Sequence, residues 1–194
     1  INPHNLLIRK CIDQLPGEHG LLALDWLNGN RSVLMNSSLS GLLIGLTLET
    51  KPEDIYRAMI EATAFGTRLI IEAYGSSKIN INELYACGGL TSNGLLLQIY
   101  ADITGLDIKV ATSSQPTALG AAILGAMAAG SGEGGYDLHE DAINKMTKPV
   151  QKTYKPNPDH QRIYNEMYKD YILLHDFFGR KNPSIMNKLK RFVE

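Results

Sequence analysis

Two adjacent glycines are the residues of this chain best suited to contact a ligand through the backbone. Gly88 and Gly89 follow a strand-like run at residues 84–87, and a helix is expected to begin near Asn93. Because glycine has no Cβ, a purine, a ribose or a phosphate can lie directly against the main chain there. The carboxyl end of a strand is also where open α/β sheets bind ligands. A double glycine after a strand is, by itself, more often a plain turn than a ligand contact.

A second run with chemical meaning is a stretch of small residues at 117–129. Its small members include Ala118, Gly120, Ala121, Ala122, Gly125 and Ala126. A strand, a helix or a ligand can approach such a helix closely because it presents little side-chain bulk. Close packing against a sheet and the shaping of a ligand pocket are both consistent with this pattern.

Neither of the familiar phosphate-binding motifs is present in its proper context. The sequence has no G-x-x-x-x-G-K-[ST], and its G-x-G-x-x-G at residues 130–135 follows a predicted helix rather than a strand, so neither a P-loop nor a dinucleotide-binding unit is predicted. A polar loop at residues 25–32 carries Asn28, Asn30 and Arg31. A guanidinium suits phosphate oxygens, so this loop either lines a cleft near phosphates or forms an ordinary surface turn.

The remaining reactive side chains favour structural roles. The five histidines show no metal-binding spacing with one another or with cysteine, and His175 is expected to be exposed or partly packed. Asp102 is interpreted as a solvated or structural carboxylate rather than a metal ligand. Cys87 is expected to be a small core residue of a strand. With only two distant cysteines, a reducing cytoplasm is the predicted compartment.

Composition sets limits on the function. The 194 residues are 44% hydrophobic and carry a formal net charge of -1, which predicts a globular protein without a general attraction for nucleic acid or anionic membranes. No apolar run approaches the length of about 20 residues that spans a bilayer. The chain does not begin with methionine, and we therefore expect it to be a fragment.

The chemical residues are expected to be positioned by alternating strands and helices. Helices are predicted over residues 3–15, 52–74, 94–104, 117–129, 136–146 and 159–178, and strands over 21–24, 41–48, 84–87 and 107–110. This order predicts an α/β fold with a parallel sheet. Tyrosines at helical spacing in the last helix predict its packing face. We expect one domain over residues 1–180 and a polar, frayed tail over 181–194.

A long motif carries a family resemblance. Residues 41–46 (GLLIGL) and, after seven intervening residues, 54–61 (DIYRAMIE) resemble the second signature of the FGGY carbohydrate kinases at every constrained position. Further residues resemble the adenosine segment of that family: Gly88, Gly89, Asn93, Gln98, Asp102, Gly105 and residues 118–122.

This resemblance implies an RNase H-like, actin-like ATPase fold, of which the chain is a truncated second lobe. ATP, Mg²⁺ and a sugar would meet in a cleft between two lobes. Gly88 and Gly89 would contact adenosine through the backbone, Leu90 would offer an apolar surface, and the Asn93 amide would meet a purine edge. Asn93 is also suited to cap the following helix. The catalytic base is expected upstream of residue 1, so no catalytic residue and no metal ligand is assigned here.

Other residues suggest a branch of the family. Gln115, residues 25–32 and residues 164–178 resemble the branch that phosphorylates the pentulose L-ribulose, and Asn28 and Arg31 would then lie at the rim of the cleft. The xylulose or glycerol branches and a non-catalytic actin-like nucleotide-binding module are the alternatives. The expected partners are ATP and a sugar, without nucleic acid or membrane, and the resemblance allows a homodimer of the full-length enzyme.

Overall fold

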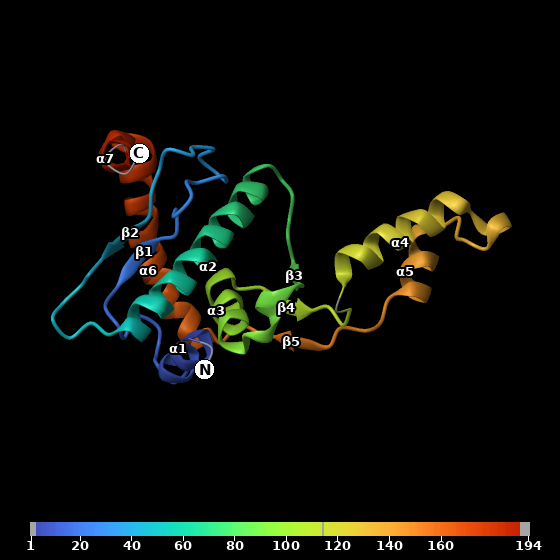
Figure 1. The fold of residues 1–194 in the computed structure, drawn as a ribbon, viewed down its shortest axis with the longest axis horizontal. Coiled ribbons are helices and arrows are strands. Elements are labelled where there is room, and N and C mark those ends of the chain that lie inside the picture. The colour runs from blue at the N-terminus through green and yellow to red at the C-terminus, as the bar shows by residue number, and fades with distance from the viewer. Residues whose placement is uncertain (1–2, 114, 191–194) are drawn as a thin grey trace.

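The computed structural model describes residues 3–113 and 115–190, which form a compact body and a protruding arm (Figure 1). The helices are α1 (Pro3–Cys11), α2 (Pro52–Ser76), α3 (Gly94–Thr104), α4 (Pro116–Ala129), α5 (His139–Met146), α6 (Pro158–Asp176) and α7 (Pro183–Lys190). The strands are β1 (Leu22–Leu24), β2 (Leu42–Ile44), β3 (Glu83–Ala86), β4 (Asp107–Val110) and β5 (Lys152–Tyr154).

Two small sheets lie within the body. β1 and β2 pair antiparallel, while the second sheet has the order β3-β4-β5, with β3 parallel to β4 and β5 antiparallel to β4. The parallel pair confirms the arrangement that the alternating pattern predicts. It also places the ends of β3 and β4 at the same edge, where the Ala111 amide donates to the Ala86 carbonyl at 3.0 Å.

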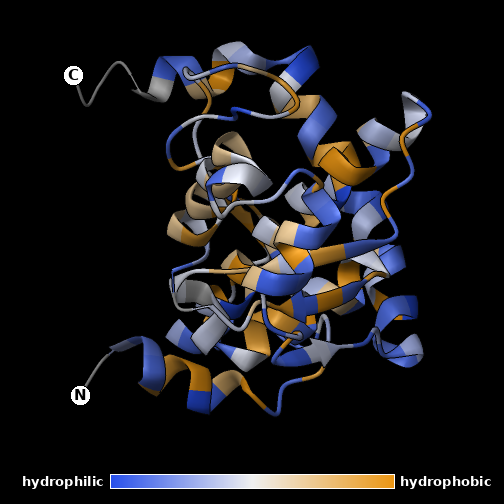
Figure 2. Cartoon of the chain, turned by 90° about the vertical axis from the view of Figure 1, so that its right-hand side faces the viewer, coloured by the Kyte–Doolittle hydropathy of each residue, from blue (hydrophilic) through white to orange (hydrophobic). Residues whose placement is uncertain are grey.

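The main core lies where α2, α3 and α6 meet. Its centre is Phe65 of α2, whose ring lies 5.3 Å from that of Tyr171 and 6.0 Å from that of Tyr164. Tyr164, Tyr168 and Tyr171 are all buried, which confirms the predicted packing face of α6. Figure 2 shows hydrophobic and hydrophilic residues mixed along the helices of the body, as expected for amphipathic helices around a shared core.

Several boundaries differ from the expected ones. α1 ends at Cys11 rather than near residue 15, and β5 forms in a segment that proline spacing marks only as a connector. The division of the chain at residue 180 stays a prediction. The expected fraying, however, is wrong for Pro183–Lys190, because these residues form α7 and Met186 is only 3% exposed in the main core.

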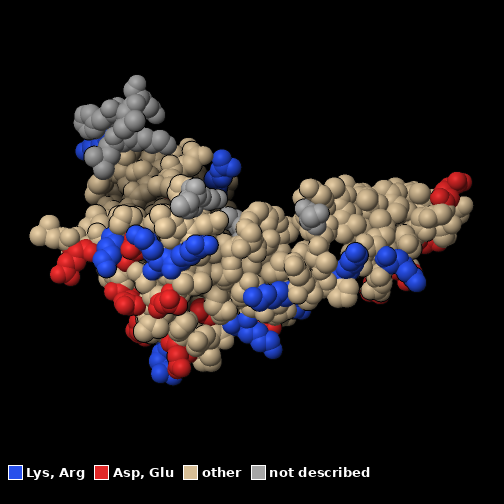
Figure 3. Space-filling model, turned by 60° about the horizontal axis from the view of Figure 1, so that its bottom comes forward, with Lys and Arg blue, Asp and Glu red and all other residues tan. Residues whose placement is uncertain are grey.

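The arm consists of α4 and α5, which extend away from the sheet (Figure 1). Within the described residues, the helix that α4 contacts most is α5, and only Ile123 of α4 is buried. A Cβ added at Gly120 or Gly125 would meet no atom within 4 Å. The close packing expected for this small-residue helix is therefore not what the structure shows. On the face seen in Figure 3, much of the arm is uncharged.

Candidate nucleotide site

The glycine pair forms a turn that faces open space. Gly88 has a φ of 87°, and its carbonyl accepts hydrogen bonds from the Thr91 hydroxyl at 2.7 Å and the Thr91 amide at 3.2 Å. The Ser92 hydroxyl donates to the Gly89 carbonyl at 2.8 Å. A Cβ at Gly88 or Gly89 would meet no atom within 4 Å. The pair is thus both a locally stabilised turn and an unobstructed stretch of backbone.

Asn93 begins α3 and lies beside a cavity. Its side-chain oxygen accepts from the Leu96 amide at 3.2 Å, so the expected helix cap is present. Because the oxygen is engaged, the amide NH₂ is the end left to donate outward. Asn93 and Gln98 line a cavity of about 510 Å³ together with Arg9 of α1 and Tyr154 of β5. The side chain of Leu90, the other predicted contact, lies outside the described residues.

Asn28 and Arg31 lie in a different cavity. Both side chains are exposed, and they line a hollow of about 640 Å³ with Asp25, Thr67 of α2 and Tyr100 of α3. The glycine pair does not line this hollow. The structure thus brings Asn28 and Arg31 together, as expected for a loop, and leaves Gly88 and Gly89 outside their cavity.

The polar loop has a buried base. Asn30 is 7% exposed, and its side-chain oxygen accepts from the Leu34 amide at 3.0 Å, which fixes the loop. Burial raises the pKa of Asp25 above its ordinary value. Burial, followed by the charge of this carboxylate, also raises the pKa of the nearby Tyr171 hydroxyl. Among the described residues, the Tyr171 hydroxyl has no hydrogen-bond partner.

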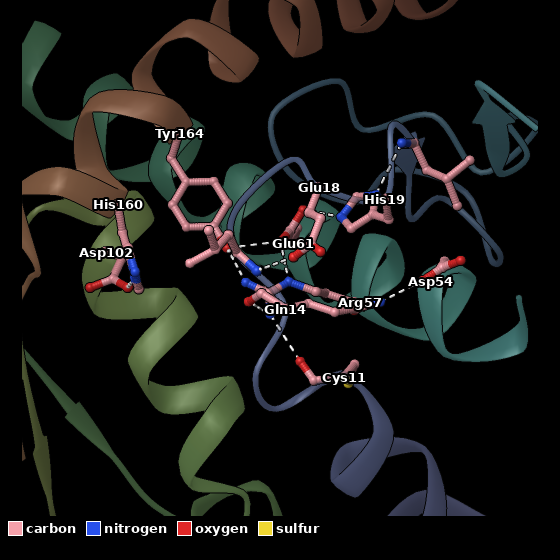
Figure 4. A network of polar contacts seen from close by, with 12 residues as sticks. Cys11, Gln14, Glu18, His19, Asp54, Arg57, Glu61, Asp102, His160 and Tyr164 are labelled. Atoms are coloured by element: carbon pink, nitrogen blue, oxygen red, sulfur yellow. Dashed lines mark hydrogen bonds and ion pairs between the residues drawn. The ribbon is translucent and has the colours of Figure 1, made fainter. Parts of the chain in front are cut away.

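Arg57 and Glu61 of the signature motif belong to a buried network of charged and polar side chains (Figure 4). Glu61 Oε1 accepts from Arg57 Nε at 2.9 Å and from the Tyr164 hydroxyl at 2.8 Å. His19 Nδ1 accepts from the Leu21 amide at 3.0 Å, so Nε2 carries the hydrogen that bonds Glu61 Oε2 at 3.0 Å. Burial, followed by the charge of Glu61, raises the pKa of Tyr164.

Arg57 also joins this network to the N-terminal segment. Its Nη1 donates to the carbonyls of Cys11 at 3.0 Å and Gln14 at 2.6 Å. Arg57 is 2% exposed and Glu61 1%. The sequence interpretation missed this role, although the spacing of four residues between Arg57 and Glu61 was a usable signal, since such residues face each other on a helix.

Two expectations about single residues are wrong. Cys87 is exposed rather than part of the core, because it follows β3, which pairs with only one neighbour in its sheet. His175 is 1% exposed rather than on the surface, because its ring packs against Trp26. The two ring centroids lie 5.4 Å apart in an edge-on arrangement. Asp102 is 2% exposed and hydrogen-bonded, as expected of a structural carboxylate.

The residues that the structure describes limit two further kinds of site. They contain no group of three or more His, Cys, Asp or Glu side chains placed to hold a metal ion. Within the same part of the chain, no helix combines the length and apolarity that crossing a membrane requires.

The fold matches that of sugar kinases of known structure. Gluconate kinase from Lactobacillus acidophilus superposes with a TM-score of 0.80 over 92% of this chain and 35% of its own, at 20% sequence identity. Xylulose kinase from Rhodospirillum rubrum gives 0.77 over 90% of this chain and 34% of its own, at 22% identity. The predicted fold class is confirmed: the chain has the actin-like fold of these kinases, as part of a lobe.

Sequence comparison defines the family. The profile of the FGGY family of carbohydrate kinases, C-terminal domain, matches residues 8–129, and the chain belongs to this family. Ribulokinase from Halalkalibacterium halodurans is 54% identical over 98% of this chain and 34% of its own length. Ribulokinase from Mycolicibacterium smegmatis is 47% identical over 96% of this chain and 32% of its own length. The chain thus spans about a third of the curated relatives it matches.

Proposed function

We propose that this chain is the nucleotide-side part of an ATP-dependent kinase that converts L-ribulose to L-ribulose 5-phosphate. The observation that carries the proposal is the 54% identity to a ribulokinase over 98% of the chain. The branch-specific residues point the same way, because Gln115 and the polar loop at 25–32 match the pattern expected for an L-ribulose kinase. The cytoplasm remains the expected compartment, and a homodimer of the full-length enzyme remains allowed.

The proposed contribution of this chain is to bind adenosine. Gly88 and Gly89 would lie against the nucleoside through unobstructed backbone, with Leu90 beside them. The Asn93 amide oxygen caps α3 at 3.2 Å, so its NH₂ would donate to a ring nitrogen of the purine. The cap and the ligand contact are therefore compatible, because they use different atoms of one side chain.

Asn28 and Arg31 are proposed to line the rim of the cleft on its phosphate side. Arg31 is exposed, and its guanidinium can donate two hydrogen bonds to phosphate oxygens. Mg²⁺ would accompany the nucleotide phosphates, as is general in phosphoryl transfer. The described residues contain no group of three or more His, Cys, Asp or Glu side chains placed to hold it.

Other members of the family are the alternative. Solved xylulose kinases share the fold at about 22% identity, which supports the architecture and not the substrate. A non-catalytic nucleotide-binding module is disfavoured because the kinase family profile covers residues 8–129.

A coupled assay of the full-length protein tests the proposal. ADP release is measured with ATP and, in turn, L-ribulose, D-xylulose and glycerol. We expect the highest kcat/KM with L-ribulose. Hydrolysis of ATP without phosphorylation of any of these sugars would refute the kinase assignment, and a clear preference for another sugar would refute the branch.

A further inference from the structure

Asp102 joins α3 to the start of α6 through one buried carboxylate. Its Oδ1 accepts from Gln98 Nε2 and from the Asn157 amide, both at 2.8 Å. Its Oδ2 lies 2.9 Å from His160 Nδ1, whose N–H donates to this oxygen. Figure 4 shows the two side chains facing each other between α3 and α6. With the Asp102 side chain only 2% exposed, water does not replace these partners.

These hydrogen bonds fix α3 to the start of α6. Gln98 Nε2 also donates to the Lys155 carbonyl at 2.8 Å, so α3 is bound to the connection that follows β5. Asn157 is itself the N-cap of α6, where its side chain accepts from the Asp159 amide at 3.0 Å. The carboxylate therefore bonds directly to the residue that sets the beginning of α6.

Apolar packing alone would define the position of α3 less closely than the hydrogen bonds of Asp102 do. Ile99 and Ile103 bury α3 in the main core, but hydrophobic contact has no preferred direction. Hydrogen bonds weaken steeply when their angles change. The Asp102 contacts therefore specify how far α3 is rotated about its axis and moved along it.

The same helix carries the proposed nucleotide contact. Asn93 is the N-cap of α3 and precedes Asp102 by nine residues, which corresponds to about 13 Å along the helix axis. Gln98, which Asp102 orients, lines the same cavity as Asn93. A rotation of α3 that followed loss of the Asp102 contacts would thus move both side chains relative to the glycine pair.

We propose that Asp102 is a positioning residue for nucleotide binding, which acts by holding α3 and its N-terminal Asn93 in register with the rest of the site. This inference rests on the proposed function, because it assumes that Asn93 contacts the nucleotide. A purely structural role would lower stability without a selective effect on ATP.

Steady-state kinetics of the full-length enzyme tests this inference. Asp102→Asn keeps the shape of the side chain but offers an NH₂ where a carboxylate oxygen accepted. We expect the KM for ATP to rise about fivefold to tenfold, as when one ligand hydrogen bond is lost, with kcat and the KM for sugar changed less than about twofold. His160→Ala, which removes one of the three partners, is a milder second variant, with an expected rise of about twofold to threefold.

The control is another carboxylate that binds α6. Glu72 of α2 accepts from the Tyr168 hydroxyl at 2.9 Å, and within the described part of the chain it forms no hydrogen bond with α3. Glu72→Gln should lower the melting temperature and leave the KM for ATP unchanged.

A double-mutant cycle separates the possible outcomes. If Asp102 acts through Asn93, Asp102→Asn should raise the KM for ATP by less than about twofold in an Asn93→Ala background. Fully additive effects would overturn the inference. So would an unchanged KM for ATP in both Asp102→Asn and His160→Ala when Asn93→Ala raises it, although the proposed function would stand. An unchanged KM in Asn93→Ala would overturn the adenosine contact and this inference together.

Discussion

Glu61 is enclosed by an arginine, a histidine and a tyrosine, so its charge is compensated inside the protein rather than by water. Its oxygens accept hydrogen bonds from Arg57, His19 and Tyr164 at 2.8 to 3.0 Å. Glu61 is the last residue of the signature motif, and its buried partners explain why a carboxylate stands at that position. The carboxylate holds α2, α6 and the segment after α1 together, and it lies among structural partners rather than at a cavity.

Loss of the Glu61 charge is expected to destabilise the chain. Glu61→Gln leaves Arg57 buried without its counter-charge, and breaking such a pair costs about 3–5 kcal/mol. Urea unfolding of this chain and of a Glu166→Gln control measures the difference. Glu166 pairs with Lys169 in solvent, where both side chains are more than two-thirds exposed, so the control should change stability by less than about 0.5 kcal/mol. Equal effects of both substitutions would contradict this prediction.

The burial of Asp25 predicts that the folding stability of the chain depends on pH. Burial raises its pKa above the ordinary value of 3.8, so the folded state holds the proton more tightly than the unfolded state. Stability contributed by this residue is therefore present at low pH and is lost as pH rises from about 3.8 through the folded pKa.

Asp25→Asn removes this ionisation cost. We expect the melting temperature of the variant to exceed that of the wild type at pH 7 and the advantage to disappear near pH 3.5, below the ordinary pKa. Thermal unfolding across that range measures it. A difference between variant and wild type that does not depend on pH would contradict the prediction.

At the scale of elements, local signals predicted the central helices and strands best. α3 and β4 agree with the predicted ranges 94–104 and 107–110, because an asparagine cap and a terminal glycine bracket α3 and alternating polar and apolar residues mark β4. β5 was missed, since its pairing with β4 is a long-range contact that three residues cannot signal locally. α7 was missed because Met186 is its main buried anchor in a polar segment.

Two glycines illustrate how the surroundings decide the effect of one substitution. Gly45 has a φ of 93°, and a Cβ there would overlap the Gly20 carbonyl oxygen. Gly45→Ala should therefore destabilise the chain by about 2 kcal/mol or more. Gly120 lies within α4 with open space beside it, so Gly120→Ala should stabilise by about 0.5–1 kcal/mol. Urea unfolding of both variants measures the contrast, and a loss of stability in Gly120→Ala would contradict the open position of α4.

The sequence predicts the residue types of the candidate site more fully than it predicts where those residues lie in space. The turn at Gly88, the cap at Asn93 and the polar loop at Asn28 and Arg31 all follow from residue type and neighbours. Their distribution over separate cavities depends on how α1, β5 and α2 pack, which spacing in the sequence does not encode. The burial of His175 depends on the same long-range packing.

At the scale of the whole molecule, this chain is expected to be inactive by itself. It spans about a third of the length of its curated relatives. Phosphoryl transfer depends on positioning both reactants and neutralising their charge. Calorimetry should show weak or no ATP binding to the 194-residue chain, and a coupled assay should show no turnover. Kinase activity of the isolated chain would contradict this expectation.

The central claim is that this part of the protein binds the adenosine end of ATP, and two matched helix caps test it most directly. Asn93 caps α3 and Asn157 caps α6, each through its side-chain oxygen. Replacing either with alanine removes a cap at a cost of about 1 kcal/mol. In the full-length enzyme, Asn93→Ala should raise the KM for ATP about tenfold and leave the KM for sugar unchanged, whereas Asn157→Ala should alter ATP dependence far less. An ATP dependence that is the same in wild type and Asn93→Ala would contradict the account.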